Sequence, residues 1–390
     1  MSPDRPATPP PAPRTATHPA PRFNPPAVPV VAAPMAGGPS TWQLAAAVSA
    51  AGGIGFIAGG MRPVEGLVQD VDAARQATPA PFGVNLFVPE PANTAIPAER
   101  SAPGSEARRR RAAEVAAYRS SLLPEAERLG VDPGDLPAAD ALDPDATDGW
   151  DAKLDAAEAG RWPLVTFTFG LPAAEVFRRL HASGSVLGVT VTTAAEAARA
   201  LKHGADLLCV QGPESGGHRS VHDPAAAPET TALGDLLAEV RAAVGPSVPL
   251  FAAGGIMDAD GVRAVLAAGA TAAQCGTAFL RADQAGTSAL QRAALDQVAA
   301  GTRFARDDGS ARTALTRAYS GRWARGLENG FMREHADAPA AYPEVNDLTK
   351  PLRAAATVAG DPESVSLWAG IGAARTRTAP AEQILESLTP

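Results

Sequence analysis

The sequence has little cysteine, few aromatic residues and no long apolar run. Its 390 residues include two cysteines, Cys209 and Cys275, and 5% aromatic residues. Two cysteines rule out a disulfide-rich scaffold, and we expect both to be reduced thiols, with a single disulfide as the alternative. No run of about 18 apolar residues is present, which excludes a transmembrane helix. The N-terminus lacks the apolar segment of a secretory signal, so we expect a cytoplasmic protein.

An excess of basic residues is also missing. The chain has 34 lysines and arginines against 42 acidic residues, for a net charge of −8. This balance disfavours nucleic acid and anionic membranes as partners. A hydrophobic content of 45% is ordinary for a globular protein, and the few aromatics predict a core of alanine, valine and leucine. Homo-oligomerisation stays open.

The N-terminal segment differs in composition from the rest. The first 29 residues contain 11 of the 37 prolines and no apolar periodicity. Such a segment cannot bury enough surface to order itself, so residues 1–28 are predicted to form a disordered tail, with a docking arm as the alternative.

Short apolar strands alternate with helical patterns along most of the remaining chain. Helix signals separate the strands, including a capping box at Thr193 and Glu196 and a helix-ending glycine at Gly204. The predicted strands are 29–34, 54–57, 82–87, 164–169, 186–191, 206–210, 248–252 and 271–275. Eight such units predict an α/β protein, a (β/α)₈ TIM barrel.

Two stretches interrupt this alternation. We therefore assign residues 29–90 and 160–300 to the barrel, and residues 91–159 and 301–390 to an additional helical lobe over the barrel mouth. Four consecutive arginines, Arg108 to Arg111, fall in the first interruption. Such a run is typical of a solvated helix face, not of an anion site.

Two glycine-bearing loops follow the last two predicted strands. In this fold ligands bind at the carboxyl ends of the strands, and phosphate often binds the loops after strands seven and eight. Gly255 follows strand seven, and Gly276 and Thr277 follow strand eight. Glycine lets backbone N–H groups approach a phosphate closely, so we expect a phosphate site here. The alternative is that these glycines only make tight turns.

The loop after the sixth strand carries the most chemistry. Gln211 offers a donor and an acceptor, and His218 follows two glycines and suits proton transfer near neutral pH. Asn85, at the end of strand three, points to the same mouth, although it could be an ordinary loop cap. A metal site made by His218, His222 and Asp223 is a weak alternative, because no helix face brings them together.

Two other motifs do not carry over into function. Gly53 and Gly55 superficially match a dinucleotide fingerprint, but a helix precedes them and a strand occupies the motif itself. Cys209 lies inside the sixth strand, where a core residue is expected instead of a nucleophile.

An ordered set of motifs resembles the nitronate monooxygenases, formerly called 2-nitropropane dioxygenases. The motifs are APMAGG (33–38), VNLF (84–87), VTFTFG (165–170), QGPESGGHR (211–219), AAGGI (252–256), QCGTAF (274–279), SGRWAR (320–325) and LWAG (367–370). The match covers about residues 29–375, with the order and spacing of the motifs kept. Cys275 stands where the family commonly has methionine, Ser220 replaces the usual glycine, and Ile371 replaces a more polar residue. The last two put the substrate in doubt.

The resemblance implies non-covalent flavin mononucleotide (FMN) and the oxidation of a nitronate by dioxygen to a carbonyl compound and nitrite. It implies that His218 is the catalytic residue near the reactive edge of the flavin. The implied FMN-binding residues are Ala33, Pro34, Met35, Asn85, Gln211, Gly216, Gly217, Gly255, Gln274, Cys275, Gly276 and Thr277. A protonated His218, Arg322 or Arg325 would favour an anionic nitronate, and no metal is expected.

Two rival interpretations stay open, and a third is excluded. The loop around His218 also resembles FMN-dependent enoyl-acyl-carrier-protein reductases, which would make the protein an NAD(P)H-driven enoyl-thioester or quinone reductase. A flavin-binding protein without turnover is a second rival. A barrel like inosine-monophosphate dehydrogenase needs a cysteine in the loop after strand six, and none is there.

Overall fold

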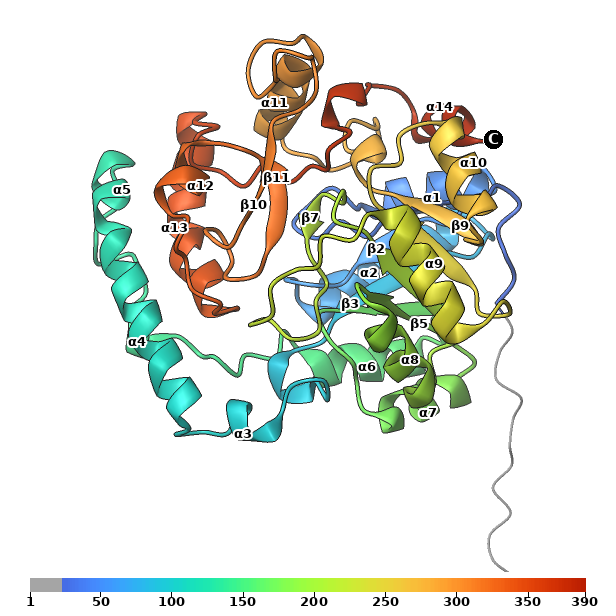
Figure 1. Ribbon diagram of the computed structural model, residues 1–390, viewed down its shortest axis with the longest axis horizontal. Coiled ribbons are helices and arrows are strands. Elements are labelled where there is room, and N and C mark those ends of the chain that lie inside the picture. The colour runs from blue at the N-terminus through green and yellow to red at the C-terminus, as the bar shows by residue number, and fades with distance from the viewer. Residues whose placement is uncertain (1–22) are drawn as a thin grey trace, which may run out of the picture.

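Eight parallel strands form a nearly closed barrel with helices between them (Figure 1). The computed structural model describes residues 23–390, so most of the predicted tail at 1–28 lies outside the described residues. The strand order is β1-β9-β8-β6-β5-β4-β3-β2, and a bridge between Val31 and Ile54 joins the two ends. The strands are β1 (Val30–Ala32), β2 (Phe56–Ala58), β3 (Gly83–Phe87), β4 (Leu164–Thr168), β5 (Val186–Val191), β6 (Leu207–Gln211), β8 (Leu250–Ala253) and β9 (Ala272–Cys275). The predicted barrel is confirmed.

One helix of the barrel follows each strand. These helices are α1 (Trp42–Ala50), α2 (Val64–Ala77), α6 (Trp150–Ala159), α7 (Ala174–Ala182), α8 (Ala194–His203), α9 (Leu233–Val244), α10 (Ala259–Ala267) and α14 (Ala381–Leu388). Predicted caps are present: Thr193 accepts from the amide of Glu196 at 3.1 Å, and Gly204 ends α8 with a φ of 113°. The chain therefore starts and stops these helices by local signals.

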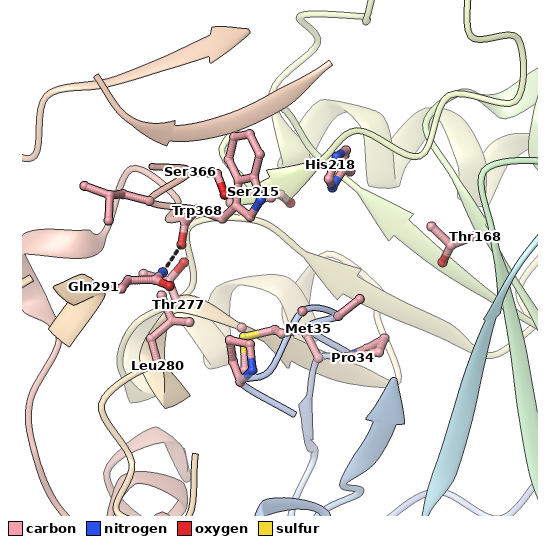
Figure 2. A pocket seen from close by; sticks show the side chains of 18 of the residues that line it. Pro34, Met35, Thr168, Ser215, His218, Thr277, Leu280, Gln291, Ser366 and Trp368 are labelled. Atoms are coloured by element: carbon pink, nitrogen blue, oxygen red, sulfur yellow. Dashed lines mark hydrogen bonds between the residues drawn. The ribbon is translucent and has the colours of Figure 1, made fainter. Parts of the chain in front are cut away.

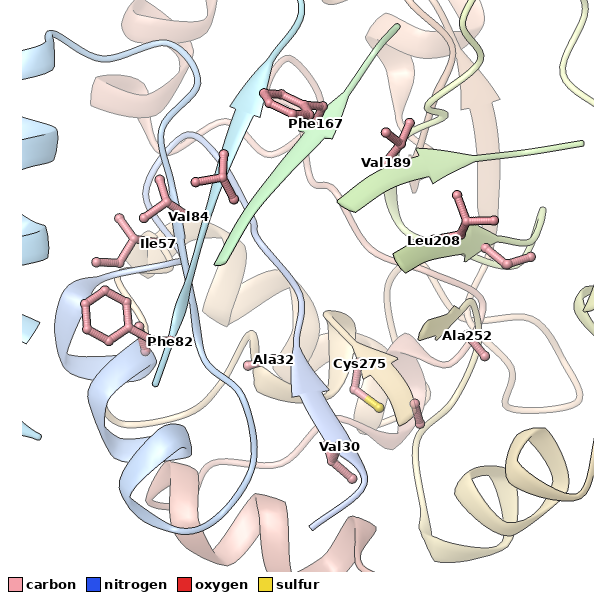
Figure 3. Close-up of a cluster of buried hydrophobic side chains, with 14 of the residues drawn as sticks. Val30, Ala32, Ile57, Phe82, Val84, Phe167, Val189, Leu208, Ala252 and Cys275 are labelled. Carbon is pink, nitrogen blue, oxygen red and sulfur yellow. The ribbon is translucent and has the colours of Figure 1, made fainter. Parts of the chain in front are cut away.

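The strands carry apolar residues on both faces, and successive residues belong to different clusters. Leu208 and Val210 pack in the cluster that includes the helices, part of which Figure 3 shows with Leu208 labelled. Leu207 and Cys209 belong to a smaller cluster of strand residues. This alternation follows from the period of two in a strand buried on both faces. Phe23 adds its ring edge-on to Phe251 of the smaller cluster, with centroids 5.4 Å apart.

Two long insertions leave the barrel at the carboxyl ends of β3 and β9 and return at α6 and α14. The first insertion contains η1 (Glu90–Ala92), α3 (Ala98–Ser101), α4 (Glu106–Ser121), α5 (Leu123–Arg128) and η2 (Ala139–Ala141). The second contains η3 (Thr277–Phe279), α11 (Ala289–Ala299), β10 (Thr313–Thr316), β11 (Ala324–Leu327), α12 (Gly330–Glu334), α13 (Glu344–Ala359) and η4 (Ala373–Arg375). A separate apolar cluster joins the two insertions, with Tyr118 and Leu122 from the first and Leu348 and Leu352 from the second. The insertions thus form a lobe with its own core.

The insertions are shorter than the lobe that we assigned from the sequence. Helices α6 and α14, at the ends of the assigned ranges 91–159 and 301–390, bury Leu154 and Ile384 in the barrel cluster. A small antiparallel sheet, β10-β11-β7, links lobe and barrel, because β7 (Gly217–His218) belongs to the loop after β6. We propose the division into barrel and lobe on this packing.

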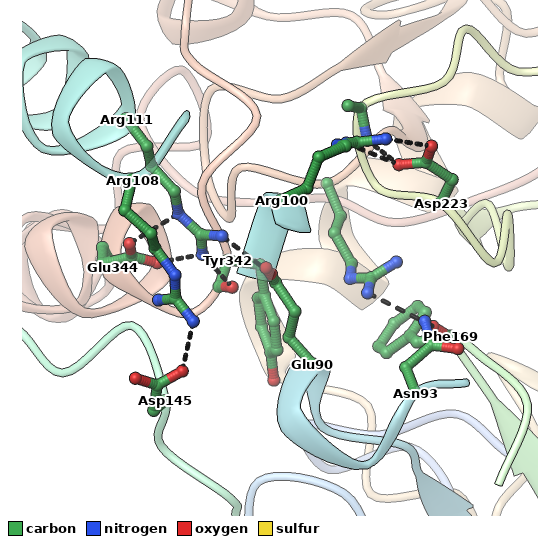
Figure 4. Close-up of polar contacts among 12 residues, drawn as sticks. Glu90, Asn93, Arg100, Arg108, Arg111, Asp145, Phe169, Asp223, Tyr342 and Glu344 are labelled. Carbon is green, nitrogen blue, oxygen red and sulfur yellow. Dashed lines mark hydrogen bonds and ion pairs between the residues drawn. The ribbon is translucent and has the colours of Figure 1, made fainter. Parts of the chain in front are cut away.

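The expected solvated arginine face is wrong for Arg111. Its guanidinium donates to Glu90 at 2.7 Å and to both carboxylate oxygens of Glu344, at 2.7 and 2.6 Å (Figure 4). Arg108 pairs with Asp145, whereas Arg110 is largely exposed. Successive residues of a helix point about 100° apart, so a run of four arginines reaches both solvent and the lobe interior. Arg111 thereby connects the two insertions.

In the part of the chain that the structure describes, no helix is long and apolar enough to span a membrane.

Candidate active site

A cavity of about 490 Å³ lies at the carboxyl ends of the barrel strands, between the barrel and the lobe. Its size falls in the range of roughly 300–1,000 Å³ that is usual for small-molecule sites. Figure 2 shows Pro34 and Met35 on one side of this cavity and His218 and Trp368 on the other. Barrel loops therefore supply one wall and the second insertion supplies part of the opposite wall.

Every residue proposed from the sequence as catalytic or cofactor-binding lines this one cavity. They are Ala33, Pro34, Met35, Asn85, Gln211, Gly216, Gly217, His218, Gly255, Gln274, Cys275, Gly276 and Thr277. They come from the ends of five strands that are far apart in the sequence. Their convergence follows from the barrel, in which all strands point their carboxyl ends to the same side.

The glycine loops leave room for a ligand at the backbone. Gly217 has a φ of 72°, and a Cβ added there would meet nothing within 4 Å. Gly255 has a φ of 68°, which favours glycine over other residues. The Thr277 hydroxyl accepts from the amide of Gly370 at 2.9 Å and keeps its own hydrogen for a ligand. These groups form an open cradle of donors.

Charge in the cavity is one-sided. Among the described residues that line it, none is aspartate or glutamate, although the chain as a whole is acidic. The two lining residues that carry full charges are Lys350 and Arg353, one turn apart on α13. A cavity with cationic groups and without carboxylates suits an anionic ligand. The spacing of three residues on a helix was the available sequence signal for this pair, which the sequence analysis missed.

The two amides predicted to face the ligand are also held by the protein. Gln211 donates to the carbonyl of His218 at 2.9 Å and accepts from the amide of Ser220 at 2.8 Å. Asn85 donates its amide nitrogen to the hydroxyls of Thr166 and Thr168 on β4, at 3.0 and 2.9 Å. Gln211 thus shapes the loop that carries His218, and Asn85 is oriented so that its carbonyl oxygen remains for a ligand.

His218 sits in an aromatic setting that the sequence did not indicate. Its ring lies edge-on to Phe169, with centroids 5.5 Å apart, and 5.3 Å from the ring of Trp368. Removal from water, and then the positive charges of Arg322 and Arg353, lower the pKa of His218 to about 3. This lowering of the pKa favours a neutral imidazole at physiological pH, against the expectation that a protonated His218 attracts an anion.

The arginines that we expected to attract a nitronate are committed elsewhere. Arg322 donates to the carbonyls of Val221 and Phe169, and Arg325 donates to the carbonyl of Pro213. Neither lines the main cavity. Burial lowers the pKa of Arg322 to about 10, so it stays cationic at neutral pH. The cations in the main cavity are those of α13 instead.

The residues of the weak metal alternative are used for structure. His222 bonds the carbonyl of Thr190 through Nε2 at 2.9 Å. Asp223 binds Arg100 of α3 through two hydrogen bonds, which ties the loop after β6 to the lobe (Figure 4). In residues 23–390 no group of three or more histidine, cysteine, aspartate or glutamate side chains is placed to hold a metal ion. Both cysteines are free and buried, and Cys209 lies inside β6.

A second cavity of about 410 Å³ adjoins the first and shares Met61, Phe87 and Lys350 with it. Met61 has a φ of 59°, which is uncommon for a residue with a side chain. Its amide donates to Asp148 at 2.9 Å, and the same carboxylate oxygen lies 2.7 Å from Nζ of Lys153. Lys153 is buried. Asp148 therefore holds Met61, in the wall between the cavities, and a buried side chain at the start of α6.

Replacing Asp148 with asparagine is expected to lower the free energy of unfolding by roughly 3 kcal/mol, because the buried Lys153 loses its counterion. Burial already lowers the pKa of Lys153, and Asp148 opposes that effect. Below its ordinary pKa the unfolded variant binds more protons at Lys153 than the folded variant does. The loss should therefore shrink as the pH rises toward 10. Urea unfolding at pH 7 and pH 9.5 measures it, with the exposed Asp151→Asn as control. An equal loss at both pH values would contradict this role.

Known proteins are similar to this chain along almost its whole length. The family model described as nitronate monooxygenase matches residues 25–390. The chain is 38% identical to nitronate monooxygenase of Pseudomonas aeruginosa and 36% identical to that of Paraburkholderia phytofirmans, over 92% of this chain and 95% and 91% of those proteins. The solved structure of nitroalkane oxidase from Streptomyces ansochromogenes is 41% identical, with a TM-score of 0.78 over 93% of this chain and 94% of that one. FabK from Thermotoga maritima is 25% identical, with a TM-score of 0.65 over 93% and 91%.

Proposed function

We propose that this chain, which belongs to the nitronate monooxygenase family, is an FMN-dependent enzyme that oxidises alkyl nitronates with dioxygen to a carbonyl compound and nitrite. The observation that carries the proposal is the cavity of about 490 Å³ at the barrel mouth. It combines an open glycine cradle, a neutral histidine and two cations, without a carboxylate among its described lining residues. Each of these features matches one requirement of the reaction.

The residues of the cavity fit FMN. The cradle of Gly217, Gly255 and Thr277 would hold the phosphate, because backbone N–H and hydroxyl donors suit a phosphate and no lining carboxylate repels it. The backbone of residues 33–35 would lie along the ring system, and the carbonyl oxygen of Asn85 would meet a polar edge. Bound FMN would supply the two-electron chemistry that no side chain provides.

The protein's own contribution is orientation and electrostatics. A nitronate is an anion, and Lys350 and Arg353 would favour its entry. His218 is neutral, so one ring nitrogen keeps a lone pair that can take the α-proton of a nitroalkane, the conjugate acid of the nitronate. The rings of Phe169 and Trp368 both lie next to the imidazole ring, with centroids 5.5 and 5.3 Å from it.

The kcat/KM for nitronate oxidation is expected to show no histidine ionisation between pH 5 and 8. An exposed histidine would gain a proton as the pH falls through about 6.5. Burial and the nearby arginines depress the pKa of His218 to about 3, so its lone pair remains throughout this interval. Steady-state rates in buffers of constant ionic strength measure this profile. A tenfold loss of kcat/KM on the acid side with a midpoint near 6.5, absent in a His218 variant, would contradict the assignment.

The direct test of the reaction uses the purified protein loaded with FMN, ethylnitronate and air. Nitrite release together with oxygen uptake, neither of which occurs with apoprotein, is the expected result. Nitrite at the rate of the protein-free control would remove the proposal.

The similarity to FabK favours one alternative function, an FMN-dependent reductase driven by NADH or NADPH. The barrel and the cofactor cradle would serve both reactions. Rapid consumption of a nicotinamide cofactor with an enoyl thioester or a quinone as acceptor, at rates above nitronate oxidation, would favour it. A flavin that no donor reduces would favour a binding protein without turnover.

A further inference from the structure

A buried serine contacts the ring of His218 from outside the cavity. Ser320 follows β10 in the small sheet, is 4% exposed, and lies with its Oγ 2.8 Å from Nε2 of His218. The backbone brings the two together, because His218 of β7 pairs with Ala324 of β11, four residues after Ser320. Two side chains of the protein make this contact.

The hydrogen bonds around Ser320 decide which nitrogen of His218 carries the hydrogen. The Ser320 hydroxyl can donate to the carbonyl of Arg322 at 3.3 Å, and it accepts from the amide of Arg322 at 3.4 Å. If Nε2 of His218 donates to Ser320, three hydrogen bonds form. If Ser320 donates to Nε2 instead, the bond to the Arg322 carbonyl is lost. Buried polar groups favour the arrangement that satisfies more of them.

The surroundings of the ring favour a neutral imidazole in that arrangement. The ring centroids of Phe169 and Trp368 lie 5.5 and 5.3 Å from that of the imidazole. The charged groups that act on the imidazole are the cations of Arg322 and Arg353. No carboxylate in the described residues forms an ion pair with His218. Because a second proton would add another positive charge, the ring carries one hydrogen, on Nε2.

We propose that Ser320 is a positioning residue that holds His218 as the Nε2–H tautomer, so that Nδ1 presents its lone pair to the substrate. This inference rests on the proposed function for the identity of the substrate, but not for the tautomer itself. The proton that leaves the α-carbon of a nitroalkane would go to Nδ1 and leave the nitronate as the other product, and the Nε2–H bonded to Ser320 would share the resulting positive charge. Without the Ser320 hydroxyl, both tautomers become accessible and Nδ1 is free for only part of the time.

The tautomer can be read directly by ¹⁵N NMR of the holoprotein labelled on its six histidines, since protonated and bare ring nitrogens differ widely in shift. Two other histidines serve as references in the same spectrum. His222 donates from Nε2 to a carbonyl, and His203 donates from Nδ1 to the carbonyl of Pro172. A His218→Gln variant identifies the signals of His218, because they disappear from its spectrum. We expect His218 to match His222 from pH 5 to 8. A match to His203 would overturn the proposal.

The Ser320→Ala variant tests the role of the hydroxyl. We expect His218 signals that average the two tautomers, unchanged signals of His203, and a kcat/KM with nitroethane about tenfold lower with FMN still bound. Ser320→Thr, which keeps the hydroxyl, should restore both the spectrum and the rate. An unaltered His218 spectrum in Ser320→Ala would contradict the proposal. If Ser320→Ala does not fold, the spectrum of the natural protein still decides the tautomer. A protein that shows the expected spectrum but does not oxidise nitronates refutes the proposed function alone.

Discussion

Replacing His218 with alanine is expected to lower kcat/KM with nitroethane, which must lose its α-proton to become the nitronate, by about 10²- to 10⁴-fold, the range usual for a positioned acid–base group. The loss should fall on turnover more than on cofactor binding. The glycine cradle would hold its ligand through backbone groups that the substitution leaves in place, and Gln211 donates to the backbone carbonyl of residue 218, which alanine retains. Steady-state kinetics with nitroethane, together with the flavin content of the purified variant, separate the two effects.

The matched control is His203→Ala, which removes an imidazole that bonds the carbonyl of Pro172 at the end of α8. His203 does not line the cavity, so its variant should keep nearly full activity. If His218→Ala retains full activity with normal flavin content, His218 is not part of the catalytic machinery. If it loses flavin along with activity, its role is in cofactor binding.

Replacing Gly216 with alanine is expected to weaken FMN binding by about 100-fold, or roughly 2.8 kcal/mol. A Cβ at this position would lie 2.3 Å from the amide nitrogen of Gly370 and 2.5 Å from the carbonyl carbon of Ala369. The amide of Gly370 also donates to Thr277, so one methyl group would push apart two segments of the proposed phosphate cradle. Backbone atoms on both sides leave no flexible side chain to yield.

Titration of the apoprotein with FMN, followed by quenching of flavin fluorescence, measures this effect. Gly234→Ala is the control, because a Cβ there meets nothing within 4 Å and Gly234 lies in α9, away from the cavity. The control should bind FMN as the natural protein does. Unchanged affinity in Gly216→Ala would show that the cradle does not hold the phosphate.

The barrel could be predicted because its signals are local. Each strand is a short apolar run, and caps such as Thr193 and glycines such as Gly204 mark helix ends within a few residues. The loops that converge on the cavity follow from the same reasoning, since a parallel barrel places the carboxyl ends of all its strands together. This explains why His218, Gly255 and Thr277 could be assigned to one site from the barrel pattern, whereas Ala33 was assigned from the family resemblance.

The contacts made by the lobe could not be predicted, because they join segments distant in the sequence. Arg111 pairs with Glu344, 233 residues away, and Ser320 meets His218 across 102 residues. A run of arginines or a lone serine carries no local sign of such a partner. The lowered pKa of His218 could not be predicted for the same reason. The pKa of His218 is lowered first by burial and then by Arg322 and Arg353, which the small sheet and α13 bring close to it.

The measurement that tests the central proposal most directly is anaerobic mixing of the FMN-loaded protein with ethylnitronate, followed by the absorbance of the flavin. The proposed function predicts rapid bleaching by the nitronate, with nitrite released when air is admitted, and slow or no bleaching by NADH and NADPH. Bleaching by a nicotinamide cofactor and not by the nitronate would contradict the proposal and assign the cavity at the barrel mouth to a reductase.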